Sequence, residues 1–239
     1  MTKIRLDIFL TNKKLVASRS QAESWIRLGK VSVDGRTINK PGHFVGPSAV
    51  VKLDAQVQYV SRAGLKLESV AQVLKLDFKD KIVLDVGSST GGFTDYVLKQ
   101  GARKVFAIDV GTEQLHPSLR RDKRIELHEK TDIRDFIPRQ PVDIVVMDVS
   151  FISLRDILPH IASLATRQTE IVAMVKPQFE AGKEQINKGV IKNDSIRRTI
   201  LKEFELWAKQ RFVIVDKRDS DVAGAKGNQE RFYLLRSLS

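Results

Sequence analysis

Four ionisable side chains stand where expected elements end, and together they could carry out proton-transfer chemistry. They occur in four separate contexts, SRAGLKL, MDVSFISL, MVKPQFE and GNQERF, as Lys66, Asp148, Lys176 and Glu230. Asp148 and Lys176 each end a strongly apolar run, so we expect both at the carboxyl edge of a sheet, where open α/β sheets bind ligands. A lysine whose pKa is lowered by burial or by a nearby cation can remove a hydroxyl proton. Two lysines and two carboxylates could tune and orient one such base, although each pair taken alone could be an ordinary salt bridge.

A glycine-rich segment, DVGSSTGGFTD (85–95), follows a strand-like run and opens an expected helix. Its glycines allow a tight turn and a close approach of the backbone to a ligand, and the N–H groups of the following helix favour an anionic group. The spacing is not G-x-G-x-x-G, which weakens a dinucleotide-binding interpretation. The segment resembles instead the first motif of class I S-adenosylmethionine methyltransferases, in which the loop holds the methionine part of the cofactor. This resemblance implies cofactor contacts from Asp85, Gly87, Ser88, Ser89, Gly91, Gly92 and Phe93.

Two further acids follow later strands of the same pattern. Asp109 lies at the end of the run 104–110, where a carboxylate can accept hydrogen bonds from both ribose hydroxyls of the cofactor. Asp132, in KTDIRDF, lies where this type of fold usually contacts the adenine amino group. Asp109 could also be an ordinary turn residue, and Asp132 could equally be a helix N-cap. The order of strand, glycine loop, helix, strand and acid favours the cofactor interpretation.

The elements that must position these residues alternate between strands and helices from about residue 80. Such alternation indicates βαβ units and a parallel sheet. Apolar residues with helical spacing predict a late helix that begins at Asn193-Asp194. Strand-sized apolar runs occur at 81–86, 104–110, 142–149, 170–175, 211–218 and 231–236.

The first 55 residues or so predict a separate small unit of two helices and a hairpin. Apolar spacing predicts one helix around 6–10 and another around 22–26. Ser20 and Glu23 have the spacing of a capping box, and Gly29 stands where a left-handed C-cap belongs. The dipeptide Asp34-Gly35 tolerates the positive φ angles of a type I′ turn, and further strand is expected at 49–53.

Charge indicates a polyanionic partner for this unit. The chain of 239 residues has 41 Lys+Arg against 29 Asp+Glu, a formal charge of +12, and about half of that excess falls in residues 1–54. A solvated helix face would explain any one of these side chains, whereas their clustering favours phosphate contacts. The segments RLDIFL and ASRSQAESWIRLGKVSVDG resemble the S4 RNA-binding domain. This resemblance implies RNA contacts from Arg5, Lys13, Arg19 and Lys30.

The whole arrangement resembles the TlyA family, in which an S4 module precedes an FtsJ-like domain with a Lys-Asp-Lys-Glu tetrad. The resemblance implies an α/β, Rossmann-like class I methyltransferase with a mostly parallel seven-stranded sheet and a small α+β S4 domain. The implied domains are 1–56 and 65–239, with a linker at 57–64. It also implies S-adenosylmethionine as cofactor and 2′-O-methylation of cytidine in ribosomal RNA. We expect the large subunit as substrate, because shorter family members are thought to have narrower targets.

Within this family we expect four roles for the ionisable residues. Lys176 would be the base and Asp148 its orienting partner near the sulfonium, while Lys66 and Glu230 would position the ribose and complete the charge network. Ribose methylation requires a hydroxyl aligned with the methyl–sulfur bond and removal of its proton as the new bond forms.

Composition excludes some chemistry and leaves four alternatives. The chain has no cysteine, which excludes disulfides, thiolate metal sites and cysteine nucleophiles, and the four histidines lack metal-ligand spacing. No metal is expected, and no apolar run suits a signal peptide or a membrane span, so we expect a cytoplasmic protein.

Base methylation is the nearest rival, but Asp148 is followed by Val-Ser-Phe rather than by the prolines of an amino-methylating motif. A nicotinamide dehydrogenase fits the fold but not the glycine spacing. An RNA-binding protein without enzymatic activity would leave the glycine loop unexplained. A pore-forming hemolysin is suggested by the family's older name, without an amphipathic segment to support it.

Overall fold

The computed structural model describes residues 3–16, 19–27, 29–54, 59–181, 190–191, 193–222, 224 and 227–238. The chain divides into two compact units, Met1–Arg62 and Ala63–Ser239. The predicted linker 57–64 begins outside the described residues, and its last three residues form the first turn of helix α3 (Arg62–Ala71). The predicted division into 1–56, 57–64 and 65–239 otherwise stays a prediction.

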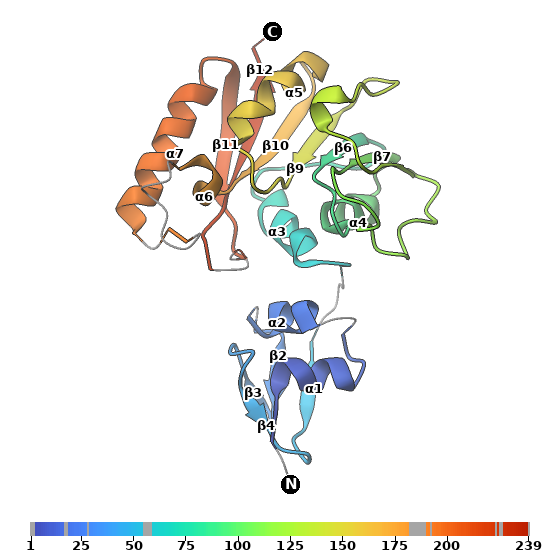
Figure 1. Ribbon diagram of the computed structural model, residues 1–239, viewed down its shortest axis with the longest axis vertical. Helices are drawn as coiled ribbons and strands as arrows, with labels where there is room; N and C mark the ends of the chain where they lie inside the picture. The colour runs from blue at the N-terminus through green and yellow to red at the C-terminus, as the bar shows by residue number, and fades with distance from the viewer. Residues whose placement is uncertain are drawn as a thin grey trace. The chain divides into compact units, whose positions relative to one another are not determined.

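The first unit contains two helices and two small antiparallel sheets (Figure 1). Strand order is β1–β4 in one sheet and β3–β2–β5 in the other. The helices and the hairpin were expected, whereas the short pair β1–β4 was not, because two-residue strands leave no periodic pattern. The elements are β1 (Ile4–Arg5), α1 (Leu6–Asn12), α2 (Arg19–Arg27), β2 (Val31–Val33), β3 (Arg36–Thr37), β4 (Phe44–Val45) and β5 (Val51–Leu53).

Local turn chemistry in this unit follows the sequence at two places and departs from it at one. Gly29 has φ of +70°, and its amide donates to the carbonyl of Ile26, so it is the expected left-handed C-cap of α2. Asp34 and Gly35 have φ of +50° and +79°, as the type I′ turn requires. The expected capping box is wrong. Helix α2 already begins at Arg19, so Ser20 lies inside it, and the carboxylate of Glu23 lies 3.6 Å from Arg19 instead.

The second unit is built on a seven-stranded sheet in the order β11-β12-β10-β9-β6-β7-β8. Only β12 (Arg231–Ser237) runs against its neighbours, β10 (Glu170–Val175) and β11 (Phe212–Asp219). The mostly parallel seven-stranded fold predicted from the sequence is therefore confirmed. The remaining strands are β6 (Ile82–Val86), β7 (Lys104–Ile108), β8 (Ile125–His128) and β9 (Ile144–Met147).

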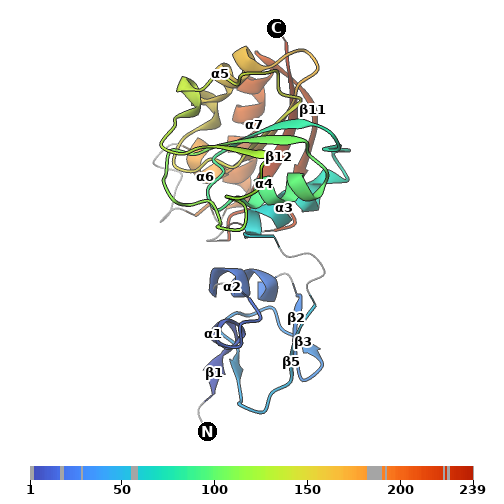
Figure 2. The same ribbon diagram turned by 90° about the vertical axis from the view of Figure 1, so that its right-hand side faces the viewer.

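Helices cover both faces of this sheet, so its central strands β6, β9 and β10 are buried on both sides. Figure 2 shows α3 and α4 on one side and α5 and α7 on the other. On the first side Phe93 of α4 packs against Phe232, with ring centroids 6.1 Å apart. On the second side Phe204 of α7 is fully buried in the main hydrophobic core. The helical elements are α4 (Gly92–Lys99), η1 (Ile133–Asp135), η2 (Leu154–Asp156), α5 (Leu158–Leu164), α6 (Pro177–Glu180) and α7 (Asp194–Ala208).

Among the described residues, no helix has both the length and the apolar character needed to cross a membrane.

We expect Asn193→Ala to lower the free energy of unfolding by about 1 kcal/mol, as the loss of an N-cap usually does. The Asn193 side chain accepts a hydrogen bond from the amide of Ser195 at 2.8 Å and so begins α7. Urea unfolding of Asn193→Ala and Asn193→Asp measures the effect, since aspartate keeps the acceptor. An equal loss in both variants would contradict this role.

Candidate active site

The glycine loop between β6 and α4 requires glycine at two positions. Gly91 has φ of +93°, and a Cβ there would lie 2.5 Å from Leu119 and 2.6 Å from Leu115. Gly87 has φ of +80°, and its Cβ would lie 3.1 Å from the carbonyl oxygen of Asp148. The loop therefore turns tightly and brings its backbone against the end of β9.

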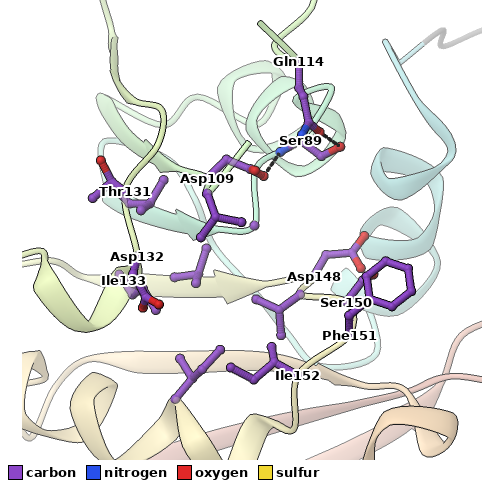
Figure 3. Close-up of a pocket in the computed structure, with 16 residues that line it drawn as sticks. Ser89, Asp109, Gln114, Thr131, Asp132, Ile133, Asp148, Ser150, Phe151 and Ile152 are labelled. Atoms are coloured by element: carbon purple, nitrogen blue, oxygen red, sulfur yellow. Dashed lines mark hydrogen bonds between the residues drawn. The ribbon is translucent and has the colours of Figure 1, made fainter. Parts of the chain in front are cut away.

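A cavity of about 450 Å³ opens beside this loop, at the carboxyl ends of the parallel strands (Figure 3). Asp109 follows β7 at its wall, and its carboxylate accepts hydrogen bonds from the amides of Ser89 and Gly111, both at 2.7 Å. Gln114, which the sequence did not indicate, accepts from the hydroxyl of Ser89 at 2.9 Å. Two amides thus fix the carboxylate, while each oxygen keeps a lone pair for a further donor.

Asp132 lies on another part of the cavity wall and has the N-cap role considered for it, while its contact with adenine stays a prediction. It is the N-cap of η1 and accepts a hydrogen bond from the amide of Arg134 at 2.9 Å. The guanidinium of Arg134 also donates to it at 2.6 Å, and these bonds lower the pKa of Asp132 to about 2. An acceptor that is ionised at neutral pH therefore faces the cavity.

Other residues of the predicted cofactor set lie behind the wall. The cavity lining includes Gly87, Ser89, Asp109 and Asp132 but none of Asp85, Ser88, Gly91, Gly92 and Phe93. Phe93 is 2% exposed and packs in the core, so the structure gives no support to the cofactor contact predicted for it.

Asp85 is fully buried and only half satisfied. Thr94 donates to its Oδ2 at 2.6 Å, while Oδ1 has no hydrogen-bond partner in the described part of the chain, nor has the buried hydroxyl of Ser88. Burial raises the pKa of Asp85 to about 7, and the charges of Asp148 and Asp109 act in the same direction. Buried polar atoms without partners are uncommon and mark a place where a polar ligand group would be stabilised.

The four ionisable residues form two buried ion pairs. Lys66 Nζ lies 2.5 Å from Glu230 Oε2, and Lys176 Nζ lies 2.6 Å from Asp148 Oδ1. The side chains of both lysines are 9% exposed, that of Glu230 is 3% exposed and that of Asp148 15% exposed. Lys176 also donates to the hydroxyl of Ser150 at 2.7 Å, a contact that the sequence did not predict.

Strand register brings these pairs together. Val175 lies opposite Arg231, so the next residues along the antiparallel pair, Lys176 and Glu230, face each other at the strand ends. Asp148 follows Met147, which lies opposite Val86 on one side and Ala173 on the other. Neighbouring strands lie about 5 Å apart, so the two pairs and the glycine loop share one edge of the sheet. Asp148 itself lines the cavity.

The loop after β9 supplies cavity residues that the sequence analysis did not single out. Ser150, Phe151 and Ile152 line the cavity, as Figure 3 shows. Phe151 has φ of +67° and is 91% exposed, and its ring centroid lies 5.2 Å from that of Phe179. Its place inside an apolar run hid it, because exposed and buried phenylalanines look alike in sequence.

In the first unit, two of the four predicted RNA contacts converge on one buried carboxylate. Asp7 is 0% exposed and accepts from Arg5 at 2.8 and 3.0 Å and from Arg19 at 2.9 Å. Burial alone would raise the pKa of Asp7, but these bonds and one from an amide lower it to about 2. Lys13 lies 5.9 Å from the ring centroid of Phe9, and the structure does not place Lys13 or Lys30 in this cluster.

No group of three or more metal-ligating side chains occurs among the residues that the structure describes.

Comparison with known proteins gives two family matches and several relatives of similar length. Residues 59–237 match the FtsJ-like methyltransferase family, and residues 4–51 match the S4 domain. The 23S rRNA (cytidine-2′-O)-methyltransferase TlyA of Campylobacter jejuni is 37% identical over 251 residues, which cover 96% of this chain and 98% of that protein. The 16S/23S rRNA (cytidine-2′-O)-methyltransferase TlyA of Mycobacterium tuberculosis is 37% identical over 242 residues, covering 98% and 90%. A solved structure from Streptococcus thermophilus, which carries a hemolysin name, has a TM-score of 0.75 at 37% identity and covers 99% of this chain and 89% of that one.

We expect Gly91→Ala to lower the free energy of unfolding by more than Gly101→Ala does. Both glycines have positive φ, so both variants should lose about 1–2 kcal/mol through backbone strain. At Gly91 the new methyl group also meets two buried leucines, which should add about 1–3 kcal/mol, whereas at Gly101 it meets only Lys79 at 3.6 Å or more. Equal losses in thermal or urea unfolding would show that the loop accommodates a side chain.

Asp85→Asn should change how stability depends on pH. The pKa of Asp85 is raised from 3.8 to about 7, so between these values the folded protein holds a proton that the unfolded chain has lost. The free energy of unfolding of the wild type therefore falls as pH rises towards 7, and the variant lacks this fall. Relative to the wild type, Asp85→Asn should gain stability from pH 5 to about 7 and then level off.

The control for this experiment is Asp122→Asn, because a bond from Arg124 lowers the pKa of Asp122 and removes it from this pH range. A flat difference between Asp85→Asn and the wild type would mean that Asp85 is ionised throughout.

Proposed function

This chain belongs to the FtsJ-like methyltransferase family, and we propose that it transfers a methyl group from S-adenosylmethionine to the ribose 2′-hydroxyl of a cytidine in ribosomal RNA. The observation that carries the proposal is the register of β9, β10 and β12, which sets two buried lysine–carboxylate pairs beside the cavity. Both TlyA relatives are named for this reaction.

The residues around the cavity fit the cofactor. Asp109 and Asp132 offer carboxylates to a ribose and an adenine amino group, and both line the cavity. Its volume of about 450 Å³ lies within the range of small-molecule sites. Near the glycine loop, the unpartnered Oδ1 of Asp85 lies behind the cavity wall and can accept from the ammonium of the methionine part through water. When bound, the cofactor supplies an electrophilic methyl group on a sulfonium.

Lys176 is the proposed base. A ribose hydroxyl is a poor nucleophile, and its proton must leave as the new carbon–oxygen bond forms. The Oγ of Ser150 lies 2.7 Å from Lys176 Nζ, which demonstrates that a hydroxyl oxygen fits within hydrogen-bond distance of this amine. As the base, Lys176 enters the reaction as an uncharged amine; Asp148 orients this amine and offsets the positive charge that it acquires with the proton.

Lys66 and Glu230 are proposed to position the ribose. Glu230 faces Lys176 across the strand ends, and Lys66 neutralises its charge from helix α3. Because the charge of Lys66 offsets that of Glu230, neither charge is left unpaired when an uncharged sugar replaces water beside them.

We propose that the first unit binds the RNA. Arg5 and Arg19 keep donors free beyond those that bind Asp7, since each guanidinium has five. Because Asp7 fixes both guanidinium groups, they can meet phosphates with little loss of side-chain entropy. Lys13 and Lys30 are exposed and would add to the same basic surface.

We propose the large ribosomal subunit as the substrate, since 23S RNA occurs in the names of both TlyA relatives and 16S RNA in only one. The cytoplasm, where ribosomal RNA is found in bacteria, is the compartment that this substrate implies.

Lys176→Met should reduce methyl transfer by about 10²–10⁴-fold, the usual contribution of a general base, and leave RNA affinity unchanged. The measurement is transfer of labelled methyl groups to unmodified large and small subunits, together with a filter-binding assay. Lys104→Met is the matched control, because Lys104 also pairs with a carboxylate, Glu126, at 2.7 Å but lies at the start of β7.

Normal transfer by Lys176→Met would refute the base assignment. Absence of transfer by the wild type to the large subunit, with cofactor bound, would refute the proposed substrate.

A further inference from the structure

We propose that Glu180 is a positioning residue that ties the loop after β9 to the segment after β10 and so sets the geometry of Lys176 relative to Asp148. Its effect on catalysis rests on the proposed function, whereas its effect on the loop does not. Glu180 is not one of the four tetrad residues and does not line the cavity.

Both carboxylate oxygens of Glu180 are used across the two segments. Oε2 accepts from the hydroxyl of Ser153 at 2.6 Å, and Oε1 accepts from the amide of Leu154 at 2.7 Å. Ser153 in turn caps η2 by accepting from the amide of Arg155 at 3.1 Å. The side chain of Glu180 is 1% exposed, so these bonds are made away from water.

The position of Glu180 connects these bonds to Lys176 and Asp148. Helix α6 has four residues, with Lys176 as its N-cap and Glu180 as its last residue. On the other segment, Asp148 precedes the loop that ends at Ser153. Asp148 and Lys176 therefore lie at the near ends of two short segments, and Glu180 fastens their far ends together.

Two further contacts join the same segments, and one of them involves Phe151, whose backbone conformation is strained. Lys176 binds Ser150, and Phe151 packs on Phe179. Phe151 has a left-handed backbone, which is strained for a residue other than glycine, and it is 91% exposed, so burial does not hold it. Neighbouring structure must hold this conformation, and the bonds from Glu180 fix the loop only two residues further on.

The burial of a carboxylate here is costly, which argues against a role in packing alone. Burial raises the pKa of Glu180, against the effect of the bonds from Ser153 and Leu154 and of the nearby charge of Arg155. An apolar side chain of similar size would avoid that cost but would leave the amide of Leu154 without an acceptor. The two acceptors and the ion pair with Arg155, whose Nε lies 3.5 Å from Oε2, are therefore what an apolar residue would lose at this position.

Substitution can separate positioning from packing. Glu180→Leu fills the space without acceptors, whereas Glu180→Gln can accept from Leu154 and donate to the hydroxyl of Ser153. We expect Glu180→Leu to lower kcat of methyl transfer about 10- to 100-fold, since misplacement by about 1 Å can cost about 100-fold. The KM for RNA should stay unchanged, and Glu180→Gln should recover most of kcat.

Asp156→Leu is the control, because it removes an exposed carboxylate from the same turn and should leave kcat unchanged. Equal kcat losses in Glu180→Leu and Asp156→Leu, or in Glu180→Leu and Glu180→Gln, would overturn the proposal. If Glu180→Leu does not fold, Ser153→Ala removes one of the two bonds and should lower kcat about 3- to 10-fold by the same argument. Unchanged kcat in Ser153→Ala would then overturn it.

Hydrogen exchange of backbone amides tests whether Glu180 holds the loop after β9, and this test does not require methyl transfer. The amides of residues 149–155 should exchange several-fold faster in Glu180→Leu than in the wild type, Glu180→Gln or Asp156→Leu. If the wild type transfers no methyl group, the proposed function is refuted. The exchange measurement still tests whether Glu180 holds the loop. Unchanged exchange in Glu180→Leu would refute the claim that Glu180 holds the loop after β9.

Discussion

Strand β12 runs opposite to the other strands, so it begins at the edge of the sheet where they end. It thereby brings a carboxylate, that of Glu230, to this edge. Six strands of the same direction finish at this edge, and β12 begins there, so the residue before it, Glu230, faces the residue after β10, Lys176. Lys66 reaches the same place from α3 and pairs with Glu230. If β12 ran parallel to β10, its first residues would lie at the opposite edge and the second ion pair could not form.

The two ion pairs are a poor way to stabilise a fold. Removing a lysine and a carboxylate from water costs several kcal/mol for each ion, and apolar replacements of both partners are often neutral or stabilising. Two such pairs side by side, next to a cavity with carboxylates fixed by backbone amides, are explained more simply by chemistry at that place. The raised pKa of Asp85 and the strained backbone of Phe151 are further local costs in the same region.

The sequence was informative where a local rule decides the structure. Gly29, Asp34-Gly35 and the helix start at Asn193-Asp194 were predicted from turn chemistry, and six of the seven strands of the large sheet from short apolar runs. No such run was singled out for β8. The convergence of Asp148 and Lys176 followed from a general property of parallel sheets. The pairing of each lysine with its own carboxylate depends on strand register, which apolar runs do not specify.

Other features could not be predicted for related reasons. Phe93 stands in the glycine motif but faces the core, because the direction of its side chain depends on how α4 packs on the sheet. Glu180 follows an apolar run like many surface glutamates, and only the approach of the loop after β9 buries it. The short strands β1 and β4 are held by long-range pairing alone.

The most direct test of the central claim is the chemical position of the transferred methyl group. Nucleoside mass spectrometry of ribosomal RNA treated with the wild-type protein and isotope-labelled cofactor separates methylribose from methylated base. The account predicts label on the ribose of cytidine and none on any base. Label on a base, with the ribose unmodified, would contradict it, because the paired lysines and carboxylates would then serve some other purpose.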